Sequence, residues 1–239
     1  MIKLLQGDCL ELMKDIPDGS VDMILCDLPY GITACTWDSV IPFEPLWEQY
    51  NRIIKDNGAI VLFGTEPFST QLKMSNLKHY KYDWIWNKVR GVGFQIAKYR
   101  PMQQHEYISV FCNGKLNYYP IMEKRDKVKK SKNYGNSKVC RLQSNDMKER
   151  TYTEKYPTSI LTYSNASQKG RLHPTQKPTE LLEYLIKTYT KEYEVVLDNC
   201  MGSGSTGVAC KRLNRNFIGI ELDKNYFDIA KERIENENN

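Results

Sequence analysis

Three residues near the start of the chain could together hold a planar amine. Asp27, Pro29 and Tyr30 follow directly after the apolar run 21–26. A carboxylate and a proline carbonyl can accept the two N–H groups of such an amine, and an aromatic ring can stack on its face. Open α/β sheets carry their chemistry at the carboxyl ends of strands, where we expect this turn. The alternative is an ordinary proline turn with a packed tyrosine, and these residues alone leave both open.

A second group of residues combines a glycine-rich turn with two carboxylates. The expected strand 194–197 runs into a turn that opens a helix, as in dinucleotide-binding fingerprints. The glycines of this turn are Gly202, Gly204 and Gly207. Asp198 ends the first strand and Glu221 ends the next one, where a carboxylate can bridge two ribose hydroxyls. This combination predicts a cofactor that contains adenosine.

The sequence around the glycine turn favours one adenosine cofactor over two others. A P-loop nucleotide site is excluded, because no Gly-Lys-Ser/Thr follows the turn. A nicotinamide dinucleotide would need the rest of a doubly wound sheet, and 32 residues follow Gly207. Asp198 could receive the ammonium of S-adenosylmethionine, whereas a pyrophosphate would be disfavoured beside it. We therefore expect S-adenosylmethionine.

Composition places the chain among globular proteins and excludes several classes. It has 239 residues, of which 41% are hydrophobic and 26% charged, enough for one large domain or a domain with an insertion. No apolar run approaches the roughly 20 residues of a membrane span, so no membrane partner is expected. The 7 cysteines form no Cys-x-x-Cys pair, and with 3 histidines there is no zinc signature. We expect reduced cysteines and no metal.

Positive charge is concentrated in the middle of the chain. Residues 115–171 hold 14 Lys and Arg against 5 Asp and Glu, while the remainder holds 20 against 24. Tyrosines are interleaved with these cations, among them Tyr118, Tyr152 and Tyr163. Aromatic rings beside cations offer stacking and phosphate contacts, which favours a nucleic acid partner. The alternative is a solvated charged loop.

The remaining sequence alternates short apolar runs with helical patterns. Helices are expected at 45–55, which could end at Gly58, at 179–189 after Pro178, and at 225–235. This alternation predicts a mostly parallel sheet of seven strands with helices on both faces. The strands are expected at 2–5, 21–26, 59–63, 82–86, 107–111, 194–197 and 216–220. The block 115–171 lacks this rhythm and is expected to be a loop-rich insertion between 1–114 and 172–239.

Five stretches of the sequence resemble those of the β-class DNA amino methyltransferases. In that family the catalytic tetrapeptide lies before the cofactor loop, as it does here. Asp27-Leu28-Pro29-Tyr30 matches the family's tetrapeptide Asp/Asn/Ser-Pro-Pro-Tyr/Phe at three positions, with Leu28 in place of the first proline. The turn 198–204 is similar to the family's cofactor loop, and 173–178 (His-Pro-Thr-Gln-Lys-Pro) to the segment that precedes it. Stretch 86–88, and residues 100–101 together with 105–107, also resemble the family. The resemblance implies a Rossmann-like class I methyltransferase fold in permuted strand order.

The resemblance also implies a reaction and a set of site residues. A methyl group would pass from S-adenosylmethionine, leaving S-adenosylhomocysteine, to the 6-amino group of an adenine flipped out of double-stranded DNA. Asp27 and the carbonyl of Pro29 or Leu28 would hold the amine, and Tyr30 would stack on the base. The residues expected at the cofactor are Asp8, Lys177, Asp198, Gly202, Gly204 and Glu221. The insertion 115–171 would be the target-recognition region, in the cytoplasm of a bacterial or phage-infected cell.

Several alternatives stay open at this point. The 4-amino group of cytosine presents similar chemistry, and related tetrapeptides serve enzymes that methylate RNA bases or protein glutamine. A nucleic-acid-binding module without turnover would show the same charge. Asp8 could equally be the N-cap of a helix, and His173 a residue of a surface turn. A homodimer and a cognate restriction enzyme are open as partners.

Overall fold

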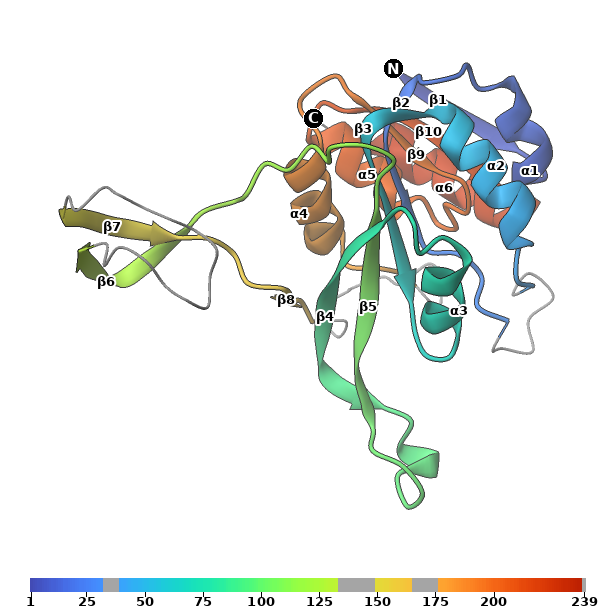
Figure 1. The fold of residues 1–239 in the computed structure, drawn as a ribbon. Coiled ribbons are helices and arrows are strands. Elements are labelled where there is room, and N and C mark those ends of the chain that lie inside the picture. The colour runs from blue at the N-terminus through green and yellow to red at the C-terminus, as the bar shows by residue number, and fades with distance from the viewer. Residues whose placement is uncertain (32–38, 133–148, 165–175, 238–239) are drawn as a thin grey trace. The chain divides into compact units, whose positions relative to one another are not determined.

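The computed structural model describes residues 1–31, 39–132, 149–164 and 176–237 (Figure 1). The chain forms two units, one of residues 1–119 with 159–239 and one of residues 120–158. The first unit contains an eight-stranded sheet in the order β1-β10-β9-β2-β3-β5-β4-β8. Its strands are β1 (Ile2–Gln6), β2 (Val21–Cys26), β3 (Ile54–Gly64), β4 (Tyr80–Val92), β5 (Gln103–Phe111), β8 (Ile160–Thr162), β9 (Val195–Asp198) and β10 (Asn216–Glu221).

Parallel pairing brings the sequence-predicted site residues to one edge of this sheet. Strands β1, β10, β9, β2 and β3 are parallel, whereas β5 runs antiparallel to both β3 and β4. Asp198 pairs with Gly219, two residues before Glu221, and Leu197 pairs with Ile24 of β2. The carboxyl ends of β2, β9 and β10 therefore lie side by side, which is where ligands bind in such sheets.

Helices cover both faces of the sheet, as the alternating sequence predicts. Along β2, Met23 and Leu25 belong to one buried core cluster, whereas Ile24 and Cys26 belong to the other. The first cluster packs under α4, α5 and α6, and the second under α1, α2 and α3. This two-residue alternation explains why β2 is apolar throughout. The helices are α1 (Cys9–Leu12), α2 (Phe43–Ile53), α3 (Phe68–Ser75), α4 (Thr179–Tyr189), α5 (Ser205–Arg212) and α6 (Lys224–Asn236), with short 3-10 turns η1 (Met13–Asp15) and η2 (Phe94–Ile96).

The structure corrects the predicted strand count and one helix cap. The eighth strand, β8, is only three residues long and pairs with β4 in parallel, too short to give a periodic signal. Gly58 does not cap α2, which ends at Ile53; it lies inside β3. A Cβ atom at Gly58 would lie 2.8 Å from the Asp22 carbonyl oxygen, so glycine permits the close approach of β3 to β2.

The second unit contains a two-stranded antiparallel sheet, within the region for which the sequence predicts a loop-rich insertion. Strand β6 (Glu123–Lys132) pairs with β7 (Glu149–Lys155), and Lys129 lies opposite Tyr152. The strands escape prediction because most of the described side chains of β6 are charged and exposed, so hydrophobicity does not alternate along it. This unit is shorter than the predicted insertion 115–171.

In the described parts of the chain, no helix combines the length and apolar character that crossing a membrane requires.

Candidate active site

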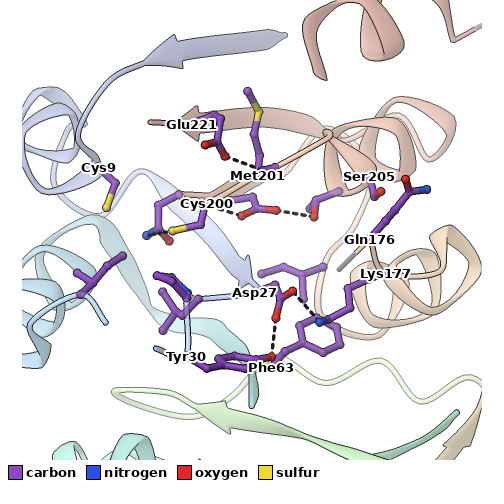
Figure 2. A pocket seen from close by; sticks show the side chains of 18 of the residues that line it. Cys9, Asp27, Tyr30, Phe63, Gln176, Lys177, Cys200, Met201, Ser205 and Glu221 are labelled. Carbon is purple, nitrogen blue, oxygen red and sulfur yellow. Dashed lines mark hydrogen bonds and ion pairs between the residues drawn. The ribbon is translucent and has the colours of Figure 1, made fainter. Parts of the chain in front are cut away.

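Asp27 lies at the carboxyl end of β2 and contacts two functional groups. The Tyr30 hydroxyl donates a hydrogen bond of 2.5 Å to Asp27 Oδ1, and Lys177 Nζ lies 2.6 Å from Oδ2 (Figure 2). The Tyr30 ring packs on Phe68 with 4.9 Å between ring centroids. Burial raises the pKa of the Asp27 carboxyl, and the Lys177 ammonium opposes this without cancelling it. The predicted pair Asp27 and Tyr30 is thus brought together, with a lysine as a third member.

Leu28, which departs from the family tetrapeptide, is a core residue. Its side chain is buried in the cluster that packs under α1, α2 and α3. Pro29, by contrast, lines the cavity together with Asp27 and Tyr30. The side chain of Leu28 therefore contributes to the packing of the core.

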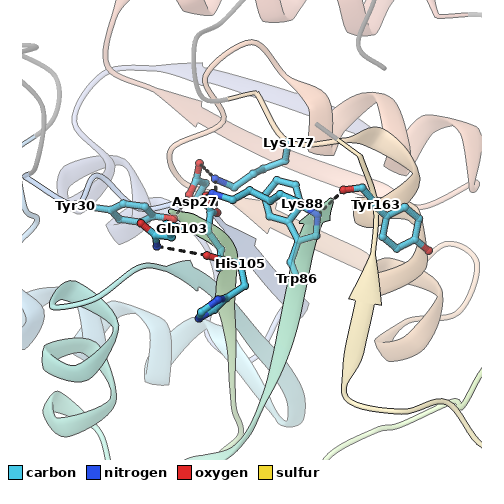
Figure 3. A network of polar contacts seen from close by, with 9 residues as sticks. Asp27, Tyr30, Trp86, Lys88, Gln103, His105, Tyr163 and Lys177 are labelled. Atoms are coloured by element: carbon cyan, nitrogen blue, oxygen red, sulfur yellow. Dashed lines mark hydrogen bonds and ion pairs between the residues drawn. The ribbon is translucent and has the colours of Figure 1, made fainter. Parts of the chain in front are cut away.

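A chain of four alternating charges extends from Asp27 into the protein. Lys177 Nζ also lies 3.3 Å from Glu106 Oε2, and Lys88 Nζ lies 2.9 Å from Glu106 Oε1 (Figure 3). Lys88, Glu106 and Lys177 are each less than 10% exposed. Burial raises the pKa of Glu106, but the two lysines together bring it below its ordinary value. Burial lowers the pKa of Lys177, yet Asp27 and Glu106 leave it raised. Glu106 and Lys177 are therefore both held in their charged forms.

Sequence reasoning missed Lys88 and Glu106 as members of the site. It singled out their stretches only as resembling the family, although two charged residues within apolar strands were a usable signal. Their contact depends on the register of β4 and β5, in which Trp86 pairs with Glu106. The Trp86 ring lies 5.8 Å from Lys177 Nζ and 5.9 Å from Lys88 Nζ, so it faces both cations.

The glycine turn and Glu221 form a second polar group at the same edge. Glu221 Oε2 accepts the backbone N–H of Gly202 at 2.8 Å, and Oε1 accepts that of Asp223 at 2.9 Å. Gly202 and Gly204 have φ values of 51° and 77°, a left-handed conformation that favours glycine. The carboxylate of Glu221 thereby fixes the turn while its remaining lone pairs stay available.

Asp198 occupies the position between the glycine turn and Asp27. It is 4% exposed, and Oδ2 accepts the Thr206 hydroxyl at 2.6 Å while Oδ1 accepts the Cys200 N–H at 3.2 Å. Burial is the largest influence on this carboxyl and raises its pKa to about 7. A cationic group placed beside Asp198 would therefore stabilise its ionised form.

Asp8 and Lys177 both line the cavity, and they contact different groups. Asp8 is the N-cap of α1, where Oδ1 accepts the N–H of Leu10 at 2.8 Å and of Glu11 at 3.4 Å, and it also lines the cavity. Lys177, expected among the cofactor residues, has its ammonium beside Asp27. His173 lies outside the described residues, as do Cys35 and Cys140. The other five cysteines are free thiols.

One cavity of about 630 Å³ joins the two polar groups. Glu221, Gly202 and Asp8 line it, and so do Asp27 and Lys177, all within the first unit. The volume lies in the range of small-molecule sites, about 300–1,000 Å³. The cavity is therefore large enough to hold a cofactor and a second reactant against each other.

The residues of this cavity fit S-adenosylmethionine. Glu221 offers acceptors for ribose hydroxyls, and Asp198 offers a buried carboxylate for the methionine ammonium. Two carboxylates on neighbouring strands would repel a pyrophosphate, which argues against a dinucleotide. Among the described residues, no group of three or more His, Cys, Asp or Glu could hold a metal ion.

Together, the fold and this site define a class I methyltransferase that uses S-adenosylmethionine. A family model described as DNA methylase matches residues 21–232. Type II methyltransferase M.HpaI from Haemophilus parainfluenzae is 29% identical over 99% of this chain and 75% of its own length. The crystal structure of the M1.HpyAVI–SAM complex has a TM-score of 0.65 and 27% identity, covering 98% of this chain and 100% of that one.

A third comparison concerns the fold alone. PvuII DNA methyltransferase, described as cytosine-N4-specific, has a TM-score of 0.70 at 17% identity and covers 97% of this chain and 86% of that one. The family model matches most of the sequence, so the chain belongs to the DNA N6/N4 methyltransferase family.

Proposed function

We propose that this enzyme methylates the 6-amino group of adenine, site-specifically, in double-stranded DNA. The single observation that carries the proposal is the cavity that joins Glu221 and Asp198 to Asp27 and Tyr30. S-Adenosylmethionine supplies an electrophilic methyl group when bound. The pairing of Asp27 with Tyr30 in the tetrapeptide favours adenine over cytosine, through the family resemblance described above.

Asp27 would activate the amine by accepting one of its protons in a hydrogen bond. The nitrogen of an exocyclic amine shares its lone pair with the ring and is a poor nucleophile. With N–H groups held by Asp27 and by the carbonyl of Pro29 or Leu28, the lone pair localises on nitrogen. Among the described residues, Tyr30 donates to one Asp27 oxygen and Lys177 to the other, so each oxygen retains a lone pair for the amine.

Positioning would supply the rest of the acceleration. The hydroxyl of Tyr30 is bound to Asp27 and its ring is packed on Phe68, so the ring is held before the base arrives. Stacking of the base on Tyr30 would offset part of the cost of flipping it, which is a few kcal/mol. The charge chain through Lys177 keeps Asp27 oriented in a buried setting.

The basic region 115–171 would read the DNA sequence. Its excess of cations and its tyrosines support contacts with phosphates and bases. The type II relatives support a role beside a restriction enzyme, in the cytoplasm of a bacterial or phage-infected cell.

Methyl transfer with labelled S-adenosylmethionine tests the proposal. The protein is incubated with unmethylated DNA, and the DNA is digested to nucleosides and separated. Label in N6-methyladenine is the expected result. Label in N4-methylcytosine would instead establish the second candidate, which the likeness in fold to the PvuII enzyme favours. Intact binding of S-adenosylmethionine without label in either base would overturn both.

A further inference from the structure

Strands β4 and β5 extend beyond the sheet as an arm that lies next to the site. We define the β4–β5 arm as residues 89–103, from the end of β4 through η2 to the start of β5 (Figure 1). None of the η2 residues is buried. The arm belongs to the first unit, as does the cavity. Its length and exposure are not needed for the core, so another role must account for them.

Large apolar side chains are concentrated on this arm. Phe94 is 79% exposed and Tyr99 is 87% exposed, and Val92, Ile96 and Met102 are exposed as well. Contiguous exposed apolar groups of this kind mark interaction sites. The rings of Phe94 and Tyr99 thus present most of their surface to solvent and contribute little to the core.

The charge of the arm is entirely positive. Arg90, Lys98 and Arg100 are exposed, and no Asp or Glu lies between Asn87 and His105. Cations interleaved with exposed aromatic rings bind nucleic acids through phosphates and stacked bases. A second copy of this chain is a poorer partner, since it would bring the same positive arm and a net charge of +5.

The base of the arm is fixed to the active site. Val92 and Gln103 line the same cavity as Asp27. Two successive pairs of the β4–β5 ladder are Asn87 with His105 and Val92 with Gln103. Between these pairs, four residues of β4 lie opposite one residue of β5, which forms a bulge. In this bulge Lys88 is buried against Glu106, while Val89 and Arg90 are exposed. Bulges redirect side chains in this way next to active sites.

Further contacts fix the base of the arm, within β4 and between β4 and β5. Asn87 Oδ1 accepts the Val89 N–H at 3.1 Å and the Gln104 side-chain amide at 3.0 Å. A Cβ atom at Gly91 would lie 2.9 Å from Met102 Cβ, so the two strands are in close contact there. The arm therefore has a defined direction relative to the cavity mouth.

We propose that the β4–β5 arm binds the DNA duplex beside the flipped base. Phe94 and Tyr99 contact bases there, and the three exposed cations contact phosphates. This inference rests on the proposed function, because it takes duplex DNA as the substrate that reaches the cavity. It adds a DNA-binding element that is separate from the basic region 115–171.

Two sets of substitutions test the two kinds of contact. Binding of a fluorescein-labelled duplex is followed by anisotropy, which reports DNA affinity whether or not methyl transfer occurs. Phe94→Ala with Tyr99→Ala should weaken duplex binding about ten-fold or more, because stacking contributes about 1–3 kcal/mol per base. Replacing Arg90, Lys98 and Arg100 by Ala should reduce the slope of log affinity against log salt by about 2–3.

The matched control lies at the opposite end of the same strand. Leu77, Lys78 and Lys81 are exposed around the start of β4, and replacing them by Ala removes one apolar group and two charges there. This control should keep the wild-type DNA affinity and salt slope. All variants should keep wild-type affinity for S-adenosylhomocysteine and wild-type thermal unfolding.

The outcomes separate the arm from the proposed function. DNA binding without methylated bases in the wild type would overturn the function, while the arm could still be judged from affinity. Wild-type affinity and salt slope in both arm variants would overturn the arm proposal. A wild-type dimer that the arm variants dissociate, with unchanged DNA binding, would show that a second copy covers the arm and would equally overturn it.

Discussion

Lys177 Nζ lies 2.6 Å from Asp27 Oδ2, although the two residues are 150 positions apart in the chain. The contact joins the carboxyl end of β2 to the segment that enters α4. Lys177 is buried, and its other ionic partner is Glu106. The lysine is therefore fixed in place, and the ionisation of Asp27 depends on it.

Lys177→Met should change how kcat depends on pH. The acid limb of this profile, where kcat rises with pH, should move to higher pH. With Lys177 present, its charge lowers the pKa of Asp27 against burial and Glu106, which both raise it. Without it the Asp27 pKa rises further, so a higher pH is needed to ionise the carboxyl. We expect a shift of about one to three pH units, measured as kcat against pH.

Lys88→Met is the control for this prediction, because Lys88 contacts Glu106 but has no contact with Asp27. It should move the acid limb less than Lys177→Met does. If Lys177 acts only on the cofactor, KM for S-adenosylmethionine should rise instead, with the acid limb unmoved. That result would contradict the role assigned to the contact.

Asp27→Asn should abolish most turnover and leave cofactor binding unchanged. The amide is isosteric but offers one acceptor oxygen in place of two and carries no charge. We expect kcat to fall at least about 10²–10³-fold, in line with losses of single electrostatic contacts in active sites. Calorimetry with S-adenosylhomocysteine should give the wild-type affinity.

The matched control is Asp228→Asn on the exposed face of α6, where the carboxylate pairs with Lys224 and lies outside the cavity. This variant should keep wild-type kcat. A fully active Asp27→Asn enzyme would refute the amine clamp.

Local patterns were enough to predict the elements that hold the site. The helix predicted at 179–189 has the same bounds as α4, because Pro178 and the apolar spacing both define it. The turn after β2 and the glycine turn were located because their residues are adjacent in sequence. Strand β8 could not be predicted in the same way, since three residues carry no periodicity.

The charge chain could not be predicted, because it depends on contacts between distant segments. Glu106 meets Lys88 only through the β4–β5 register and its bulge. The contact of the Lys177 ammonium with Asp27 also joins residues far apart in the chain, which no local pattern indicates. Burial of these groups likewise follows from packing of the whole sheet.

Gly207→Ala should destabilise the protein although alanine favours helices. Alanine has the better helix propensity by about 1 kcal/mol. A Cβ atom at Gly207, however, would lie 2.3 Å from Ile234 Cδ1 and 2.8 Å from Phe217 Cε1. Overpacking of this kind costs about 1–3 kcal/mol, so urea unfolding should show a lower free energy of unfolding.

Ile234→Val provides the compensating variant, because it removes the Cδ1 atom that is closest to the added methyl group. The double variant should lose less stability than the sum of the two single variants. A Gly207→Ala protein more stable than wild type would show that α5 does not need this close packing.

Asp198 should make cofactor affinity depend on pH. Because burial raises its pKa to about 7, the carboxyl is protonated in the free protein below that pH. In the proposed complex the methionine ammonium would bind the ionised form, so affinity should rise from pH 5.5 to about 7, below the pH at which the ligand's own α-amino group, with a pKa of about 7.7–8.0, loses its proton. Below pH 7, binding should release up to one proton, which calorimetry in buffers of different ionisation enthalpy measures.

The same shift has the opposite effect on the stability of the free protein. Folding raises the pKa of this carboxyl above its value of about 4 in the unfolded chain. Its contribution to the free energy of unfolding is therefore greatest below about pH 4 and is lost as pH rises through 7. Asp198→Asn should therefore stabilise the free protein at pH 8, by an amount on the order of 4 kcal/mol at most. It should also weaken cofactor binding and flatten its pH dependence. Unchanged affinity with an unchanged pH profile would show that Asp198 does not receive the ammonium.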